Sequence, residues 1–266
     1  MSKILPTINE PADLKKVPTN KLAQVAQEVR DELIEVCSKN GGHLGSNLGV
    51  TEITVALHHV FNSPQDKFIF DVSHQGYVHK MLTGRREYLH TLRQTDGCSG
   101  FLQREESAHD HFGAGHAGTA FSAALGLAAA RDQKGTDDNV VAIVGDGAFG
   151  CGVSLEALNN VIETTDRLIV ILNDNKMSIS PNVGGLSKYL NRIITDKRYT
   201  NIKHGIGDLI AKIPSVGEKI RTSLGRVDEA VKSLVSPGAL FEELGLKYYG
   251  PIDGHDIEGL VNIFNN

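Results

Sequence analysis

The chain has 266 residues, 40% of them hydrophobic, which is enough for one large domain or two small ones. Its formal net charge of −5 and its lack of tryptophan argue against a nucleic-acid partner. No apolar run approaches the roughly 20 residues that a membrane-spanning helix needs, and three distant cysteines without metal-ligand spacing are typical of free thiols. We therefore expect a cytoplasmic protein with no membrane partner.

Several elements are predicted before residue 131. Apolar residues recur at helical spacing over 22–37, and Gly41-Gly42 follows as a stop signal. We expect this helix to be capped by Thr19 or Asn20. A second helix is predicted over 51–61, a short buried strand over 67–72, and an Ala-rich helix over 120–130 that packs closely on a neighbour.

The clearest architecture lies between Asn139 and Asp174. Residues 140–144 and 168–172 are apolar strands, and a helix is predicted between them over 153–163. Two buried strands joined by a helix form a βαβ crossover, so the strands are parallel. The predicted fold class is α/β, a parallel sheet with helices on both faces.

The remaining part of the chain is less regular. Residues 188–232 carry many basic side chains and few apolar clusters, apart from one amphipathic helix near their end. We expect either a mobile segment or a solvated connector over 188–232, within one domain that covers 1–266. The last residues are predicted to lie inside a helix.

Polar side chains follow three of the predicted strands where those strands end. They are Ser73-His74, Gly145-Asp146-Gly147 and Asn173-Asp174-Asn175. Parallel strands bring their carboxyl ends to one edge of the sheet, where ligands bind in open α/β folds. A carboxylate, an amide and an imidazole are therefore expected near one point.

This group of side chains has the chemistry of a metal-bridged phosphate site. Gly147 and Ala148 open the next helix, whose free N–H groups favour an anion. Asp146 would repel a bare phosphate, so a cation is expected between them. Carboxylate, amide and carbonyl oxygens are hard ligands that suit octahedral Mg²⁺.

The spacing makes the site more specific. Gly145-Asp146-Gly147, with Asn175 29 residues after Asp146, resembles the thiamine diphosphate motif, which begins with GDG and ends in Asn. Glycines that flank an aspartate mostly mark ordinary turns, but here a strand, a helix and a second strand frame them in the order that the motif requires.

Further segments narrow the resemblance to the 1-deoxy-D-xylulose-5-phosphate synthase family, from about Pro18 to the last residue. The matching segments are Gly41 to Leu44, His74-Gln75 with Tyr77, His79-Lys80, Leu82 to Arg86, Leu172 to Ser180, Asn182 to Gly184 and Tyr248 to Asp256. Transketolases in the strict sense match only the general arrangement of these segments.

The resemblance implies a role for each matching residue. Mg²⁺ would be held by Asp146, Asn175 and the carbonyl of Met177. Thiamine diphosphate would contact His74, Gly147 and Ala148, the segment Gly115-His116-Ala117, and Tyr248 near its thiazolium end. His43 and His255 would handle protons during addition and release.

For several of these residues a purely structural role stays open as an alternative. His79 and His116 could be core histidines, His43 could cap a helix, and His255 lies in a predicted turn. Cys151 is interpreted as a packing residue beside the site.

Two segments depart from the family pattern. The usual Gly-His-Ser-Ser is Gly115-His116-Ala117-Gly118 here, without two hydroxyls, and this puts the affinity for the cofactor in doubt. The segment Ala148-Phe149-Gly150-Cys151-Gly152 after the metal aspartate is also unusual.

The family joins pyruvate, after decarboxylation, to D-glyceraldehyde 3-phosphate. It is a thiamine diphosphate-dependent transferase of the transketolase type that supplies precursors of isoprenoids and thiamine, and its members are homodimers. The resemblance implies that the pyrimidine-binding and carboxy-terminal domains are absent here. We expect an amino-terminal fragment or a half-enzyme with a partner chain, inactive alone. A non-catalytic Mg–thiamine diphosphate module and a split transketolase-like subunit with another substrate are the alternatives.

Overall fold

The computed structural model describes residues 2–113, 115–175, 183–195 and 238–266. The chain divides into two compact units, one formed by Met1–Asn182 with Ile252–Asn266 and the other by Val183–Pro251. The first unit holds the sheet and nearly all the predicted site residues. Among the described residues, none of the helices is long and apolar enough to span a bilayer.

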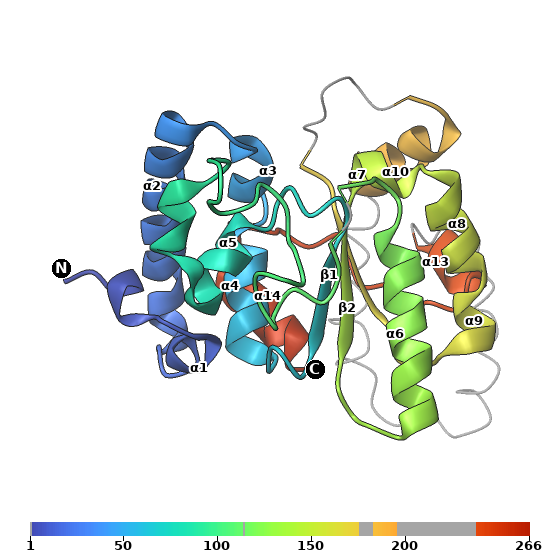
Figure 1. Ribbon diagram of the computed structural model, residues 1–266. Helices are drawn as coiled ribbons and strands as arrows, with labels where there is room; N and C mark the ends of the chain where they lie inside the picture. Colours follow the sequence, from blue (N-terminus) through green and yellow to red (C-terminus); the bar gives the residue numbers. More distant parts are fainter. Residues whose placement is uncertain (1, 114, 176–182, 196–237) are drawn as a thin grey trace, which may run out of the picture. The chain divides into compact units, whose positions relative to one another are not determined.

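A parallel three-stranded sheet forms the centre of the first unit (Figure 1). Its strands are β1 (Lys67–Phe70), β2 (Val140–Gly145) and β3 (Ile169–Asn173), in the order β1-β2-β3. Lys67 pairs with Val140, and Gly145 pairs with Asn173. The carboxyl ends of β2 and β3 are therefore in register. The predicted α/β class is confirmed.

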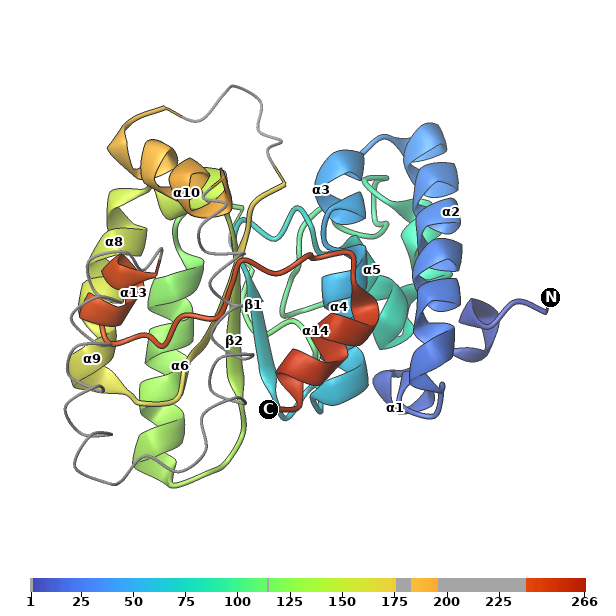
Figure 2. The ribbon, with the colours of Figure 1, turned by 180° about the vertical axis from the view of Figure 1, so that it is seen from behind.

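One face of the sheet shares an apolar core with the helices α4 (Thr51–Val60) and α14 (Ile257–Phe264), and α2 (Leu22–Asn40) packs on α4. The side chains of a strand alternate between the two faces. Phe68 and Phe70 of β1 thus join the same apolar cluster as Val141 and Ile143 of β2. This cluster is the main core, and α4 and α14 lie side by side within it (Figure 2).

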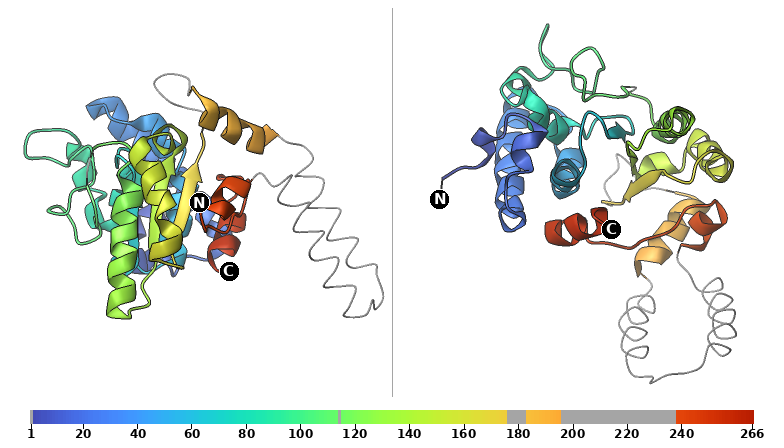
Figure 3. Two further views of the ribbon diagram at one scale, coloured as in Figure 1. Left: turned by 90° about the vertical axis from the view of Figure 1, so that its right-hand side faces the viewer. Right: turned by 90° about the horizontal axis from the view of Figure 1, so that it is seen from below.

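The opposite face is covered by α6 (Ala120–Lys134), with α8 (Gly152–Asn159) beside it (Figure 3). Alanine and glycine along α6 allow this close approach, as the sequence predicted. The crossover from β2 to β3 runs through α7 (Asp146–Phe149), α8 and α9 (Val161–Thr164). Helices on both faces explain why β2 is buried along nearly its whole length.

The shorter elements connect these layers. In the first unit they are η1 (Leu5–Thr7), α1 (Pro11–Leu14), η2 (Thr19–Lys21), α3 (Leu44–Leu48), α5 (Tyr77–Lys80), the π-helical turn η3 (Met81–Arg85) and η4 (Tyr88–Thr91). The second unit contains α10 (Gly185–Thr195) and α13 (Ala239–Glu243).

Two sequence predictions about helix ends are wrong. The residue before α2 is Lys21, without a side-chain cap, because Thr19 and Asn20 already belong to η2. The helix predicted over 153–163 is interrupted at Asn160. The helix predicted at the last residues is present as α14, and Asn265 after it still has helical backbone angles. The predicted stop at Gly41 is confirmed, with a φ of 71°.

The segment 188–232 is covered only at its start. Residues 188–195 belong to α10, and residues 196–232 lie outside the described residues, as does the amphipathic helix predicted near their end. That the segment 188–232 is mobile stays a prediction.

Candidate active site

A strained turn at the carboxyl end of β1 presents His74. Val72 and Ser73 both have positive φ values, 61° and 70°, which are uncommon for residues other than glycine. The buried carboxylate of Asp71 accepts hydrogen bonds from the backbone N–H of Gly118 (2.9 Å) and of Ala120 (3.0 Å). Asp71 therefore ties the segment 115–117 to the same edge of the sheet.

The carboxyl ends of β2 and β3 bring acidic side chains together. Asp146 follows Gly145, Asp174 follows Asn173, and the two strand ends are paired. Burial, and then the negative charge of Asp174, raise the pKa of the Asp146 carboxyl above its ordinary value. Two carboxyl groups that crowd each other in a half-buried place favour a cation between or beside them.

Asn175 lies against Gly49, the residue that follows α3. A Cβ atom on Gly49 would be 2.9 Å from Asn175 Nδ2, so a larger residue at position 49 would displace the Asn175 side chain. Within the described part of the chain, no three His, Cys, Asp or Glu side chains form a metal-binding group. A cation here would need amide, backbone and ligand oxygens in addition to Asp146, which is the donor set predicted for Mg²⁺.

His43 and His74 meet at this edge, held by one buried amide. Asn47 Nδ2 donates to the carbonyl oxygens of His43 (2.8 Å) and His74 (2.9 Å), and its Oδ1 accepts from the Tyr77 N–H (2.8 Å). The two imidazole rings are 5.5 Å apart and nearly perpendicular. Tyr77 Oη lies 3.1 Å from His43 Nδ1. His43 is the residue before α3, but its side chain makes no capping hydrogen bond there and contacts Tyr77 instead, so the capping interpretation is wrong.

Both imidazoles are neutral at neutral pH. Burial, and then the neighbouring His43, lower the pKa of His74 to about 4. Burial, and then the positive charge of Arg93, lower the pKa of His43. His74 Nδ1 and Gln75 Oε1 are buried without a hydrogen-bond partner among the described residues. Buried polar atoms of this kind call for a ligand or water, and they fit the diphosphate that the sequence predicts at His74.

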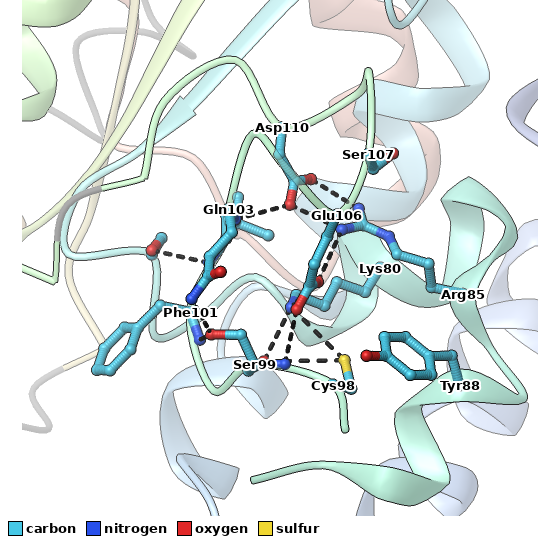
Figure 4. A network of polar contacts seen from close by, with 12 residues as sticks. Lys80, Arg85, Tyr88, Cys98, Ser99, Phe101, Gln103, Glu106, Ser107 and Asp110 are labelled. Carbon is cyan, nitrogen blue, oxygen red and sulfur yellow. Dashed lines mark hydrogen bonds and ion pairs between the residues drawn. The ribbon is translucent and has the colours of Figure 1, made fainter. Parts of the chain in front are cut away.

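A loop over residues 93–113 lies beside His43. Contacts between buried charged side chains hold this loop in place (Figure 4). Lys80 is fully buried, and its ammonium donates to Glu106 (2.6 Å) and to the carbonyl oxygen of Ser99 (2.8 Å). Glu106 also accepts from the Ser99 N–H (2.7 Å). The turn at Ser99 places the ring of Phe101 5.5 Å from that of His43.

The second half of this network contains His79. Arg85 forms a two-pronged ion pair with Asp110, at 2.7 and 2.6 Å, and Asp110 contacts His79 Nε2 at 3.2 Å. His79 Nδ1 lies 2.9 Å from His58 Nε2, and both histidines are fully buried. The interpretation of His79 as a core histidine with hydrogen bonds is confirmed.

His255 lies beside α4, in the turn before α14. Its Nδ1 is 3.0 Å from Glu52 Oε2, and Glu52 is paired with Arg30 of α2. Arg30 also donates to the carbonyl oxygen of Leu48 (3.1 Å), next to the Gly49 that contacts Asn175. A continuous set of contacts thus runs from His255 to Asn175 at the carboxyl edge of the sheet.

The other predicted site residues are placed less completely. Gly147 and Ala148 lie in α7 directly after Asp146, and Gly115, His116 and Ala117 are exposed at the end of β1. Tyr248 belongs to the second unit, where its ring stacks on Phe241 at 5.6 Å. Met177 lies outside the described residues. The roles of all these residues stay predictions.

The two departures from the family pattern lie against each other. Gly118 has a φ of 84°, and a Cβ atom on it would come within 2.6 Å of the Cβ of Cys151. Ser154 Oγ lies between the carbonyl oxygens of Ala148 (3.0 Å) and Gly118 (3.3 Å), and its single hydrogen can be donated to either, so Ser154 contacts both segments. Cys151 is therefore a packing residue, as predicted, and it occupies the space that a larger residue at 118 would need.

Replacing Gly118 by alanine should lower the free energy of unfolding by about 2–4 kcal/mol, from overpacking and a disfavoured φ together. Gly115→Ala is the matched control, because Gly115 has a φ of 71° and a Cβ atom added there would meet nothing within 4 Å. In Gly115→Ala the free energy of unfolding should fall only by the cost of placing alanine at a positive φ. Urea unfolding of G118A, G115A and the double variant G118A/C151G measures this. An equal loss in G118A and G115A would contradict the packing argument.

Sequence reasoning gave no role to Tyr77, although it lies in a matching segment, and it missed Asn47, Phe101 and Glu52. Asn47 and Glu52 lie on helices where a polar side chain is normally solvated, yet both are buried. The one available signal was their position just after Gly41-Gly42-His43, in a segment already matched to the family. Apart from His43, which is four residues before Asn47, the partners named above lie 22 to 203 residues away in sequence, which spacing cannot reveal.

Comparisons with known proteins identify the family of this chain. A family described as 1-deoxy-D-xylulose-5-phosphate synthase matches residues 5–266. The synthase of Methylacidiphilum infernorum is 54% identical over 264 residues, which cover 99% of this chain and 42% of the relative. That of Caldanaerobacter subterraneus is 52% identical over 260 residues, covering 98% of this chain and 42% of the relative.

A solved structure shares the fold at much lower identity. It is a transketolase variant from Pichia stipitis, with a TM-score of 0.64 and 17% identity, and the match covers 94% of this chain and 34% of that one. The chain spans about two fifths of the length of the curated relatives, and it matches their amino-terminal part. On these matches, the chain belongs to the 1-deoxy-D-xylulose-5-phosphate synthase family.

Proposed function

We propose that this chain binds thiamine diphosphate through Mg²⁺ at the carboxyl edge of its sheet. The observation that carries the proposal is the pairing of the β2 and β3 ends, which brings Asp146 beside Asp174 just before Asn175. The buried Nδ1 of His74, which has no partner in the described part of the chain, supports it from the end of β1. Family membership independently implies a thiamine diphosphate-dependent transferase.

The binding residues follow from this placement. Asp146, Asn175 and the carbonyl of Met177 would hold Mg²⁺. The diphosphate would contact the side chain of His74, the backbone of Gly147 and Ala148, and the segment 115–117. A neutral imidazole at His74 can donate a hydrogen bond to a phosphate oxygen without changing the charge of the site. Tyr248 would lie near the thiazolium end.

The proposed reaction joins pyruvate and D-glyceraldehyde 3-phosphate to give 1-deoxy-D-xylulose 5-phosphate and CO₂. The bound cofactor supplies stabilisation of a carbanion. His43 and His255 would hold and move protons at the substrate oxygens. A neutral His43, with Tyr77 Oη at its Nδ1, can accept a proton near neutral pH. The partners would be a second copy of the chain and the part of the enzyme that the longer relatives contain.

A non-catalytic module that only binds Mg–thiamine diphosphate is the second candidate. The observation that favours it is the absence of hydroxyl side chains at Ala117 and Gly118. Because Gly118 is packed against Cys151, this departure is accommodated within the fold. A split transketolase-like subunit with another substrate would bind Mg–thiamine diphosphate through the same residues at the carboxyl edge of the sheet.

Release of CO₂ from pyruvate, dependent on D-glyceraldehyde 3-phosphate, tests the proposed reaction. We expect none from the 266-residue chain alone, and release once the remaining part of the Methylacidiphilum relative is added as a separate protein. Turnover by the chain alone would contradict the proposal that the active site needs residues from the remaining part of the enzyme. A chain that binds the cofactor but yields no CO₂ with the added part would be the non-catalytic module.

A further inference from the structure

The contacts of His255 determine which of its ring nitrogens carries the proton. Two groups approach Nδ1: the Glu52 carboxylate at 3.0 Å and Arg30 Nη2 at 3.3 Å. A carboxylate accepts hydrogen bonds and a guanidinium only donates them, so the two contacts demand opposite states of Nδ1. Both cannot be hydrogen bonds to the same neutral ring.

The donor count of Arg30 resolves this conflict. Nη2 has two hydrogens, and both are used, one by Glu52 Oε2 at 2.6 Å and one by the carbonyl oxygen of Leu48 at 3.1 Å. Nη1 donates to the other oxygen of Glu52. The guanidinium therefore has no hydrogen left on Nη2 for His255. The short contact to Glu52 is the real hydrogen bond, and it requires a proton on Nδ1.

Glu52 is well suited to hold this proton. Its side chain is 11% exposed, in the first turn of α4, and both of its oxygens are bound by Arg30. Burial alone would raise its pKa, but the hydrogen bonds from Arg30 and His255 hold the pKa of Glu52 below its ordinary value. It is thus a fixed, charged acceptor.

The backbone of the turn fixes the imidazole from the other side. The His255 N–H donates to Asp253 Oδ1 at 2.9 Å, and Asp256 caps α14 by accepting from the Gly259 N–H at 3.0 Å. Gly254 lies against Ile53, the residue after Glu52. The ring therefore stays beside α4, and its side chain is still 60% exposed, which leaves the far nitrogen accessible.

We propose that Glu52, oriented by Arg30, is a positioning residue that holds His255 as its Nδ1–H tautomer, so that Nε2 is the nitrogen that accepts a proton. This extends the proposed function, on which the role of His255 rests. When Nε2 takes a proton, the ring becomes a cation beside the Glu52 carboxylate, which stabilises it. A carboxylate that orients a histidine in this manner fixes both its tautomer and its direction.

Long-range ¹H–¹⁵N spectra of the labelled chain read the tautomer directly, at about pH 8, where ordinary imidazoles are neutral. The chain has 11 histidines, so the signals of His255 are identified by their loss in His255→Gln. We expect a proton-bearing Nδ1 and a bare Nε2 as the major form. A major Nε2–H form in the unsubstituted chain would overturn the proposal, whatever any variant does.

Substitutions then test whether Glu52 is the cause. Glu52→Ala should shift His255 to the Nε2–H form, while Glu52→Gln, which keeps an oxygen acceptor, should retain most of the Nδ1–H form. Glu35→Ala is the control, because Glu35 makes an exposed pair on the same helix as Arg30. An unchanged tautomer in a folded E52A would also overturn the proposal. The spectra need neither cofactor nor substrate, so a failure of the proposed function would show separately, as absent cofactor binding.

Discussion

Replacing Lys80 by methionine is expected to lower the free energy of unfolding by about 3–5 kcal/mol, the range for breaking one partner out of a buried ion pair. The Lys80 side chain is fully buried, and its three donors are directed at Glu106, the Ser99 carbonyl and the sulfur of Cys98. Methionine fills a similar volume without charge. Glu106, 12% exposed, would keep Arg85, at 3.3 Å, as its cationic partner within the described ranges.

Chemical unfolding of K80M measures this loss. Lys39→Met is the matched control, since Lys39 forms an exposed pair with Glu35 on α2, and such pairs contribute less than about 1 kcal/mol. The double variant K80M/E106L should lose less than the sum of the two single changes, because E106L alone removes the carboxylate that pairs with the buried Lys80 ammonium, and the double variant removes that ammonium as well. A loss below about 1 kcal/mol in K80M, well under the cost of breaking a buried pair, would mean that the loop over 93–113 is held by other contacts.

The sheet and its polar edge could be predicted from the sequence because both depend on local patterns. Continuous apolar runs at 140–144 and 168–172 predicted buried parallel strands, and the strand ends then fixed Asp146 near Asn175 by topology alone. His74 followed from the same rule at the end of β1. These predictions need only neighbouring residues and the geometry of a parallel sheet.

The loop and the helix ends could not be predicted in this way. Residues 93–113 have no periodicity, and their position depends on contacts of Lys80 and Arg85 with carboxylates 21 to 26 residues away. Glu52 resembles a solvated first-turn acid, yet Arg30 and His255 bury it from distant segments. The cap expected at Thr19 failed because a 3₁₀ turn precedes α2. For the loop and for Glu52, tertiary contacts override the local signal.

Removing the Asp146 carboxylate should lower the affinity for thiamine diphosphate in the presence of Mg²⁺ by at least about 100-fold. Loss of groups that only support metal ligands already costs about 10- to 100-fold in metal affinity, and Asp146 is proposed as a direct ligand. Without the cation, the diphosphate would face Asp174 unshielded. Because the two carboxyl groups crowd each other, Asp146→Ala should leave the fold intact, which circular dichroism can verify.

Titration calorimetry of thiamine diphosphate into the purified chain, with Mg²⁺ and again with a chelator, tests the metal-bridged site most directly. Asp166→Ala is the control, an exposed acidic residue before β3 at the opposite end of that strand. We expect binding by the unsubstituted chain and by D166A only when Mg²⁺ is present, and none by D146A under either condition. Equal affinity in D146A and the unsubstituted chain, or binding that ignores the chelator, would contradict the site.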